Sequence, residues 1–302
     1  MTNGLLKKIR KISNITSKRL QEAVDIKDEN LKIEINKALQ QDINSIIKVH
    51  HMQSLRKLDI SYCNISDITG LEYAVNLTEL ILNGNKIVDL TPIAELINLN
   101  ILCLNNMNLD NIDFLEKLTN LVEVSLIESK VSDISTLKYL KNLRELRASD
   151  NLIEDISPLS NCSMLQLLDV SFNKIKDISF IEKLQKLQFL NLGYNQIRDI
   201  SNLPMLNQLR TLDISKNNIS DISPLKTLKN VDDIAVGNQI INLSTTFKKH
   251  EIVGLNKSLI NIYPSLNNMH FNGSGMHIQF MNYYKDEDRI YNFEVFLVIE
   301  NN

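Results

Sequence analysis

The chain has 302 residues, of which 43% are hydrophobic, which is enough apolar material for a sizeable buried core. Its 33 basic and 36 acidic residues leave a formal net charge of -3, so the molecule as a whole has no positive field that would attract nucleic acid. No apolar run approaches the roughly 18 residues that a membrane helix needs. We therefore expect neither nucleic-acid binding nor membrane insertion.

The first 54 residues precede any repeat and divide into two parts. Residues 1 to 28 are polar, with a basic start, and we expect them to be loosely held. Residues 29 to 54 place Leu31, Ile35, Leu39 and further apolar residues close to helical spacing. This spacing predicts a helical N-terminal cap on the first repeat.

A repeat of 22 residues fills residues 55 to 243. Eight full units read LxxLxLxxNxIxDIxxLxxLxN, and a degenerate ninth begins at Val231. The L-x-L alternation at repeat positions 4 and 6 predicts one short strand per unit, and only a 3₁₀ turn fits into the few residues of the outer limb. The pattern predicts an α/β leucine-rich-repeat solenoid with parallel strands on a concave face and 3₁₀ turns on a convex face. The full units begin at Leu55, Leu77, Leu99, Leu121, Leu143, Leu165, Leu187 and Leu209.

Two polar positions recur within the repeat. Because an amide both donates and accepts, asparagine at position 9 is expected to satisfy backbone groups that the turn buries. Cys63, Met107 and Ser129 replace that asparagine, so we expect this ladder to be weakest in the N-terminal half. Aspartate at position 13 starts the outer turn and predicts caps, not calcium ligands. The position-9 asparagines are Asn85, Asn151, Asn173, Asn195 and Asn217.

After Val236 the repeat dissolves. Residues 244 to 302 contain alternating stretches such as GMHIQFMNYY, separated by turn-like NNMHFNGSG and KDEDR. We expect a small β-rich C-terminal cap on the last repeat.

The repeat NxIxDISPLxxL, the entry NLKIEINKAL and the segment SDITGLEYAVNLTELILNGNKI resemble the internalin-type leucine-rich-repeat proteins of Gram-positive bacteria, over about residues 29 to 243. The resemblance implies a protein-binding concave face, an immunoglobulin-like fold after the GNQIINL segment, and commonly a secreted or cell-surface location. This sequence departs from the family because it shows no signal peptide or sorting motif. As it stands the chain is expected to be cytoplasmic, unless its start is incomplete.

Side chains at repeat positions 3, 5, 7 and 8 face outward, so their chemistry carries the information about a partner. Acidic residues outnumber basic ones there, and aromatic and aliphatic residues lie among them, which favours a protein partner with basic and apolar contact residues. The alternative is that the charges only maintain solubility and that Leu167, Phe172 and Phe189 cover one another. The candidate partner-binding residues are Asp59, Glu79, Ile81, Ile101, Glu123, Glu145, Arg147, Leu167, Asp169, Phe172, Phe189, Tyr194 and Asp213.

The sequence shows few residues in patterns typical of catalysis or metal binding. It has no phosphate-binding loop, nucleophile elbow or HExxH zinc motif, and Cys63, Cys103 and Cys162 lack the CxxC spacing of a metal or disulfide framework. We expect no catalytic residue, cofactor or metal, and a monomeric, non-catalytic protein-binding scaffold. Two alternatives remain open: a cytoplasmic regulatory subunit of a phosphatase-like enzyme, whose family uses the same repeat length, and a targeting module for an activity in the C-terminal tail.

Overall fold

The computed structural model divides into two compact units, each of which is described by itself. The first unit comprises Met1–Val131 with Tyr139–Leu143, and the second comprises Ser132–Lys138 with Arg144–Asn302. The residues described are 18–221, 224–225, 228, 230–237, 240–242, 277–279, 282–286, 289–293 and 296–298.

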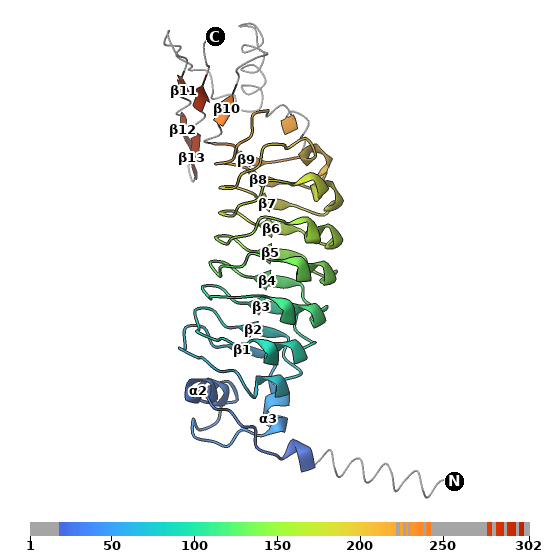
Figure 1. Cartoon of the computed structure of the whole chain (residues 1–302). Coiled ribbons are helices and arrows are strands. Elements are labelled where there is room, and N and C mark those ends of the chain that lie inside the picture. Colours follow the sequence, from blue (N-terminus) through green and yellow to red (C-terminus); the bar gives the residue numbers. More distant parts are fainter. Residues whose placement is uncertain are drawn as a thin grey trace, which may run out of the picture. The chain divides into compact units, whose positions relative to one another are not determined.

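Each repeat contributes one parallel strand of three residues, as the sequence predicts. In the first unit the strands pair in chain order, each residue opposite the residue 22 positions further along, and those of the second unit do the same (Figure 1). The strands of the first unit are β1 Lys57–Asp59, β2 Glu79–Ile81, β3 Ile101–Cys103 and β4 Glu123–Ser125. Those of the second unit are β5 Glu145–Arg147, β6 Leu167–Asp169, β7 Phe189–Asn191, β8 Thr211–Asp213 and β9 Asp233–Ala235.

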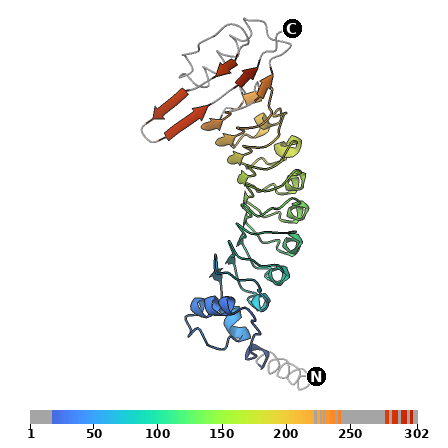
Figure 2. The same cartoon turned by 60° about the vertical axis from the view of Figure 1, so that its left-hand side comes forward.

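Short 3₁₀ helices alternate with the strands, and Figure 2 shows them stacked on one side of each unit with the strands on the other. The middle residue of each strand is buried, for example Leu102 and Leu190 at 0% exposure, because it points toward the 3₁₀ helices. Its two neighbours point outward, although Ser125 is buried as well. The helices are η1 Leu71–Tyr73, η2 Thr91–Glu95, η3 Asp113–Lys117, η4 Ser135–Tyr139, η5 Ser157–Asn161, η6 Ser179–Lys183 and η7 Leu203–Met205.

The asparagine ladder at position 9 is confirmed. Asn195 Oδ1 accepts the Ile175 N–H at 3.0 Å, and its Nδ2 donates to the carbonyls of Val170 and Leu192, both at 3.0 Å. In the first unit the Ser129 hydroxyl takes over one of these roles and donates to the Leu104 carbonyl at 2.7 Å. A serine therefore replaces part of the bonding that an asparagine provides.

A second asparagine ladder lies at position 22, the last position of the repeat consensus, and the sequence pattern alone does not predict its bonds. Asn98 Nδ2 donates to the Val75 carbonyl at 2.8 Å, 23 residues back in the chain, and Asn120 donates to Ile97 at 2.9 Å. Three repeats of the second unit carry other residues there, namely Met164, Lys186 and Gln208. The equivalent bonds are made by Asn76, Asn142 and Asn230.

The aspartates at position 13 act as caps, as predicted. Asp177 Oδ1 accepts the Ser179 N–H at 2.7 Å, and Asp155 accepts that of Ser157 at 2.8 Å, each at the start of a 3₁₀ helix. These bonds satisfy backbone donors that the short helices leave unpaired.

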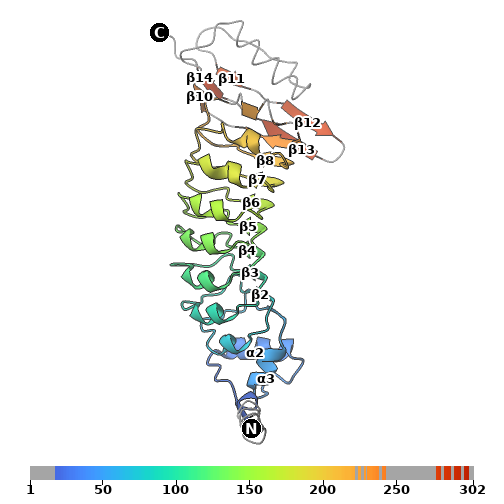
Figure 3. The same ribbon diagram turned by 90° about the vertical axis from the view of Figure 1, so that its right-hand side faces the viewer.

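Two helices form the N-terminal cap, α2 Glu29–Ala38 and α3 Val49–Ser54, at the end of the first unit that Figure 3 draws in blue. The prediction of a helical cap is confirmed, but Ile43 and Ile46 belong to the loop between the helices and are exposed.

Residues 18 to 28 are attached to this cap, in contrast to the expectation that they are loosely held. Ala23 forms an antiparallel bridge with Lys48, and the Val24 N–H donates to the Ile47 carbonyl at 2.9 Å. Ile26 is buried, so this stretch contributes to the core of the cap. Residues 1 to 17 lie outside the described residues.

The described part of the C-terminal segment consists of strands. β10 pairs with β14 in parallel, β11 pairs with β14 in the antiparallel sense, and β12 and β13 form an antiparallel pair. The β-rich character agrees with the sequence, and the immunoglobulin-like fold stays a prediction. The strands are β10 Ile240–Asn242, β11 His277–Gln279, β12 Asn282–Asp286, β13 Arg289–Phe293 and β14 Phe296–Val298.

Among the described helices, none has the length and apolar composition needed to cross a membrane.

Candidate protein-binding surface

The outward side chains of β5 to β8 form a surface that we call the strand face of the second unit. Leu167 and Phe189 lie side by side in register, and both are half-buried. Asp169 and Asp213 lie at the other ends of their strands, separated by Asn191. Glu145 and Arg147 belong to the same face. Phe172 and Tyr194 directly follow the strands β6 and β7, which brings the number of predicted contact residues on this unit to eight.

The residue at repeat position 8 adopts a left-handed backbone in every full repeat, with φ between 53° and 66°. The bonding of the solenoid imposes this conformation: the N–H of Phe172 donates to the Gly193 carbonyl at 2.9 Å, and that of Tyr194 donates to Ser215 at 2.8 Å. In proteins generally, bulky side chains are uncommon in the left-handed region, because this backbone conformation crowds Cβ. The position-8 residues are Tyr62, Gly84, Asn106 and Glu128 in the first unit and Asp150, Phe172, Tyr194 and Lys216 in the second.

Phe172 and Tyr194 stack on each other at the edge of the strand face. Their ring centroids lie 3.9 Å apart with 13° between the ring planes, and the residues are 50% and 46% exposed. Phe172 therefore packs against Tyr194, and the alternative that Leu167, Phe172 and Phe189 cover one another stays open. Two aromatic rings held in a strained backbone conformation and left half-exposed are unusual for a purely structural role.

The carboxylates of this face have partners within the protein. Asp169 Oδ1 accepts both the N–H and the hydroxyl of Ser171, at 3.1 and 2.7 Å, and Asp213 Oδ1 accepts the Ser215 N–H at 2.8 Å. Glu145 forms an ion pair with Arg147 at 2.9 Å. Arg147 offsets the charge of Glu145, whereas the serine hydrogen bonds bring no opposite charge to Asp169 or Asp213.

The remaining predicted contact residues lie on the first unit. Glu79 is paired with Lys57 at 2.6 Å, and Asp59 Oδ1 accepts the Ser61 hydroxyl at 2.7 Å. Ile81, Ile101 and Glu123 are half-buried on adjacent strands.

The cysteines and histidines of the described residues form no reactive cluster. Cys162 is fully buried, and burial raises the pKa of its thiol to about 11. The rings of His50 and His51 lie edge to face at 4.1 Å, and His51 Nδ1 accepts the Lys48 N–H at the start of α3. No group of three or more histidine, cysteine, aspartate or glutamate residues in the described part of the chain is placed to hold a metal ion.

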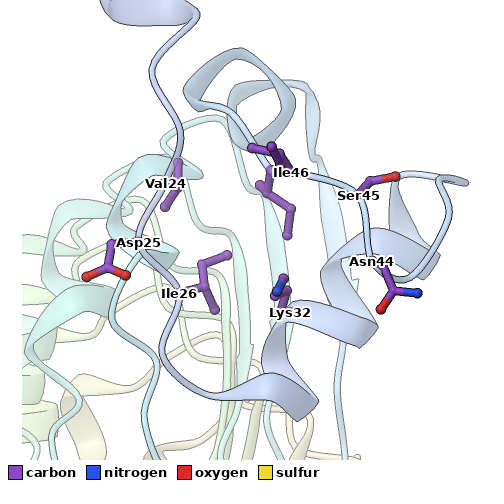
Figure 4. Close-up of a pocket in the computed structure, with 8 residues that line it drawn as sticks. Val24, Asp25, Ile26, Lys32, Asn44, Ser45 and Ile46 are labelled. Atoms are coloured by element: carbon purple, nitrogen blue, oxygen red, sulfur yellow. The ribbon is translucent and has the colours of Figure 1, made fainter.

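A small pocket of about 220 Å³ lies in the N-terminal cap. Figure 4 shows the carboxylate of Asp25 and the amide of Asn44 pointing away from Ile26 and Ile46. The lining combines apolar side chains with polar ones such as Lys32 and Ser45.

Comparison with known proteins identifies the repeats as leucine-rich repeats. Family models described as leucine-rich repeats match residues 53–95, 163–205 and 208–228. No curated protein matches this chain in sequence. A leucine-rich-repeat protein of Leptospira interrogans, 23% identical with a TM-score of 0.55 over 68% of this chain and 60% of its own, shares the fold.

Two solved structures from Listeria monocytogenes are more similar in sequence. Internalin C2 is 30% identical, with a TM-score of 0.67, over 69% of this chain and 93% of its own. An internalin named inlF is also 30% identical, with a TM-score of 0.52, over 71% of this chain and 77% of its own. This fold is typically protein-binding and generally non-catalytic. On this similarity, and on the 22-residue repeat with its helical cap, the chain belongs to the internalin family of leucine-rich-repeat proteins.

Proposed function

We propose that this protein is a non-catalytic scaffold that binds a protein partner on the strand face of its second unit, with the stacked Phe172 and Tyr194 as anchors. The observation that carries the proposal is the aromatic pair: both rings are half-exposed and each is stacked on the other, at neighbouring repeats of the solenoid. A rigid aromatic surface loses little conformational entropy on binding, which is why such side chains dominate interface energies.

The partner should present an apolar side chain to the aromatic pair and a basic side chain near Asp169 and Asp213. Each of these carboxylates accepts a local bond through Oδ1, and Oδ2 has no further hydrogen bond among the described residues. A basic group could therefore pair with Oδ2 without breaking the local bond. Leu167 and Phe189 would extend the apolar contact, and Glu145 and Arg147 would lie at the rim.

Site-specific photocrosslinking tests the location of the contact. A photoreactive amino acid at Asn191, on the strand face, is expected to crosslink the partner, whereas the same group at Met205, exposed on η7, is not. Crosslinking from Met205 alone would place the contact on the 3₁₀ side and refute the proposal. Recovery of an intracellular phosphatase-like enzyme in the crosslinked product would favour a regulatory subunit.

The five predicted residues of the first unit are retained as a second, weaker part of the proposal. No exposed stacked aromatic pair is found among the described residues of this unit, and Glu79 is paired with Lys57. They are Asp59, Glu79, Ile81, Ile101 and Glu123.

A further inference from the structure

The first unit carries a different surface, built around Tyr62, that the protein-binding proposal does not use. Tyr62 occupies position 8 of the first repeat and is 68% exposed. Its ring lies against Gly84: a Cβ atom on that glycine would lie 2.3 Å from Tyr62 Cδ1 and Cε1. A side chain at position 84 would displace the Tyr62 ring, so glycine is what allows the ring to lie here.

The Tyr62 ring is also held at its far end. Asn106 Nδ2 donates to the tyrosine hydroxyl at 3.0 Å, so consecutive repeats supply the ring, the surface under it and the group that fixes its tip. An aromatic side chain that is fixed in this way and two-thirds exposed is a preorganised surface for stacking, not a flexible solubilising group.

The residues that precede Gly84 and Asn106 in the chain, Asn83 and Asn105, carry amide groups whose orientation is determined. Asn83 Oδ1 accepts the Asn105 N–H at 2.8 Å, and Asn105 Oδ1 accepts the Ile127 N–H at 2.8 Å and the Ser125 hydroxyl at 2.7 Å. A backbone N–H can only donate, so the atom that faces it must be the amide oxygen. Each Nδ2 is thereby turned away from that bond, and neither donates to another described residue.

The surface therefore combines one fixed aromatic ring with two amide donors at the same position of adjacent repeats, whose strands are spaced about 4.8 Å apart. The tyrosine O–H and Asn106 Oδ1 add a donor and an acceptor. None of these groups is charged, and the nearby Lys57 and Glu79 neutralise each other at 2.6 Å. Uncharged, mixed donors and acceptors beside an aromatic ring match a neutral ligand rich in hydroxyl groups.

We propose that the Tyr62 surface, consisting of Tyr62, Asn83, Gly84, Asn105 and Asn106, binds a neutral sugar. A pyranose ring packs its C–H groups on an aromatic side chain, and two of its hydroxyls in a 1,3 relation are separated by nearly the spacing of the two amides. A polyproline peptide fits less well, because its carbonyls on one side recur only every roughly 9 Å. An extended peptide presents them every roughly 6.6 Å, which also exceeds the strand spacing.

Saturation-transfer NMR with cellotriose, maltotriose and chitotriose tests the proposal on the full chain. At least one of these sugars should bind, and Tyr62→Ala should abolish the signal. Asn83→Asp and Asn105→Asp each keep the inward oxygen and replace only the outward donor, so they should weaken binding about five- to tenfold without changing the melting temperature.

Asn108→Asp is the matched control, since it adds the same charge at an exposed asparagine of the third repeat and should bind like the unaltered chain. Absence of binding by all three sugars would overturn the proposal. So would unchanged affinity in both amide variants, or binding of a hexaproline peptide with the same dependence on Tyr62 in place of sugar. Because none of these residues belongs to the second unit, failure here leaves the protein-binding proposal intact.

Discussion

Asp28 Oδ2 lies 2.8 Å from the backbone nitrogen of Ser66 and so ties the N-terminal cap to the first repeat. The other oxygen of the same carboxylate caps α2 by accepting the Leu31 N–H at 3.1 Å. Burial by itself would raise the pKa of Asp28, but the hydrogen bonds from Ser66, Leu31 and Asp67 outweigh it, so the pKa lies below its ordinary value of 3.8.

Asp28→Ala is therefore expected to lower the free energy of unfolding by about 1 to 2 kcal/mol near neutral pH. The pKa of Asp28 is lower in the folded chain than in the unfolded chain. The stabilisation by Asp28 is therefore complete above pH 3.8 and is lost as the pH falls through the pKa of the folded state. Urea unfolding near neutral pH and in acid measures the difference. Asp25→Ala, which removes an exposed carboxylate of the same segment, is the control; an equal loss in both variants would remove the special role of Asp28.

The asparagine ladder makes a separate prediction about the second unit. Asn195→Ala leaves the buried Ile175 N–H and the Val170 and Leu192 carbonyls without their side-chain partner. Each unpaired buried group costs about 1 to 3 kcal/mol, so we expect a loss of about 2 kcal/mol or more in unfolding free energy. Asn218→Ala, at an exposed asparagine of the next repeat, should change it by less than about 0.5 kcal/mol. Similar denaturation midpoints for the two variants would contradict this assignment.

Adjacent residues on β7 test the orientation of the strands. Leu190 is 0% exposed and Phe189 points outward, so the same substitution should have opposite consequences. Leu190→Asp buries an unpaired charge and is expected to cost about 4 kcal/mol or more, whereas Phe189→Asp should leave a folded chain. Circular dichroism and thermal melting distinguish the two; a folded Leu190→Asp chain with unchanged melting temperature would disprove the register.

The thiols provide a chemical test of burial. Since burial raises the pKa of Cys162 to about 11 and covers its sulfur, this residue should resist a thiol reagent in the folded protein. Cys63 and Cys103 are half-buried and should be modified first. Mass spectrometry of the labelled peptides reports the order, and all three should react alike in urea. Early labelling of Cys162 in folded protein would show that its repeat opens readily.

The sequence predicts the strands and the first asparagine ladder because both depend on residue types that recur every 22 positions. Leu102 and Leu190 are buried and Asn195 bonds to the backbone, as that period requires. The link between Asp28 and Ser66 could not be predicted in this way, because it joins residues 38 positions apart and outside the repeat.

The candidate surface could be predicted only in part. That Phe172 and Tyr194 face outward follows from their repeat positions, but their left-handed backbone does not, since position 8 also carries aspartate, glutamate, lysine and glycine. The conformation comes from the hydrogen bonds between repeats, not from the residue type. The local bonds of Asp169 to Ser171 likewise depend on side-chain rotamers, which a residue count cannot show.

The central claim, that the aromatic pair anchors a protein partner, is tested most directly by the dissociation constant of the photocrosslinked partner for the double variant Phe172→Ala with Tyr194→Ala. We predict an affinity about 30-fold weaker than that of the unaltered chain, equivalent to about 2 kcal/mol, at an unchanged melting temperature. Met205→Ala, which removes an equally exposed apolar side chain from η7, should bind normally. An unaltered dissociation constant for the double variant would contradict the account.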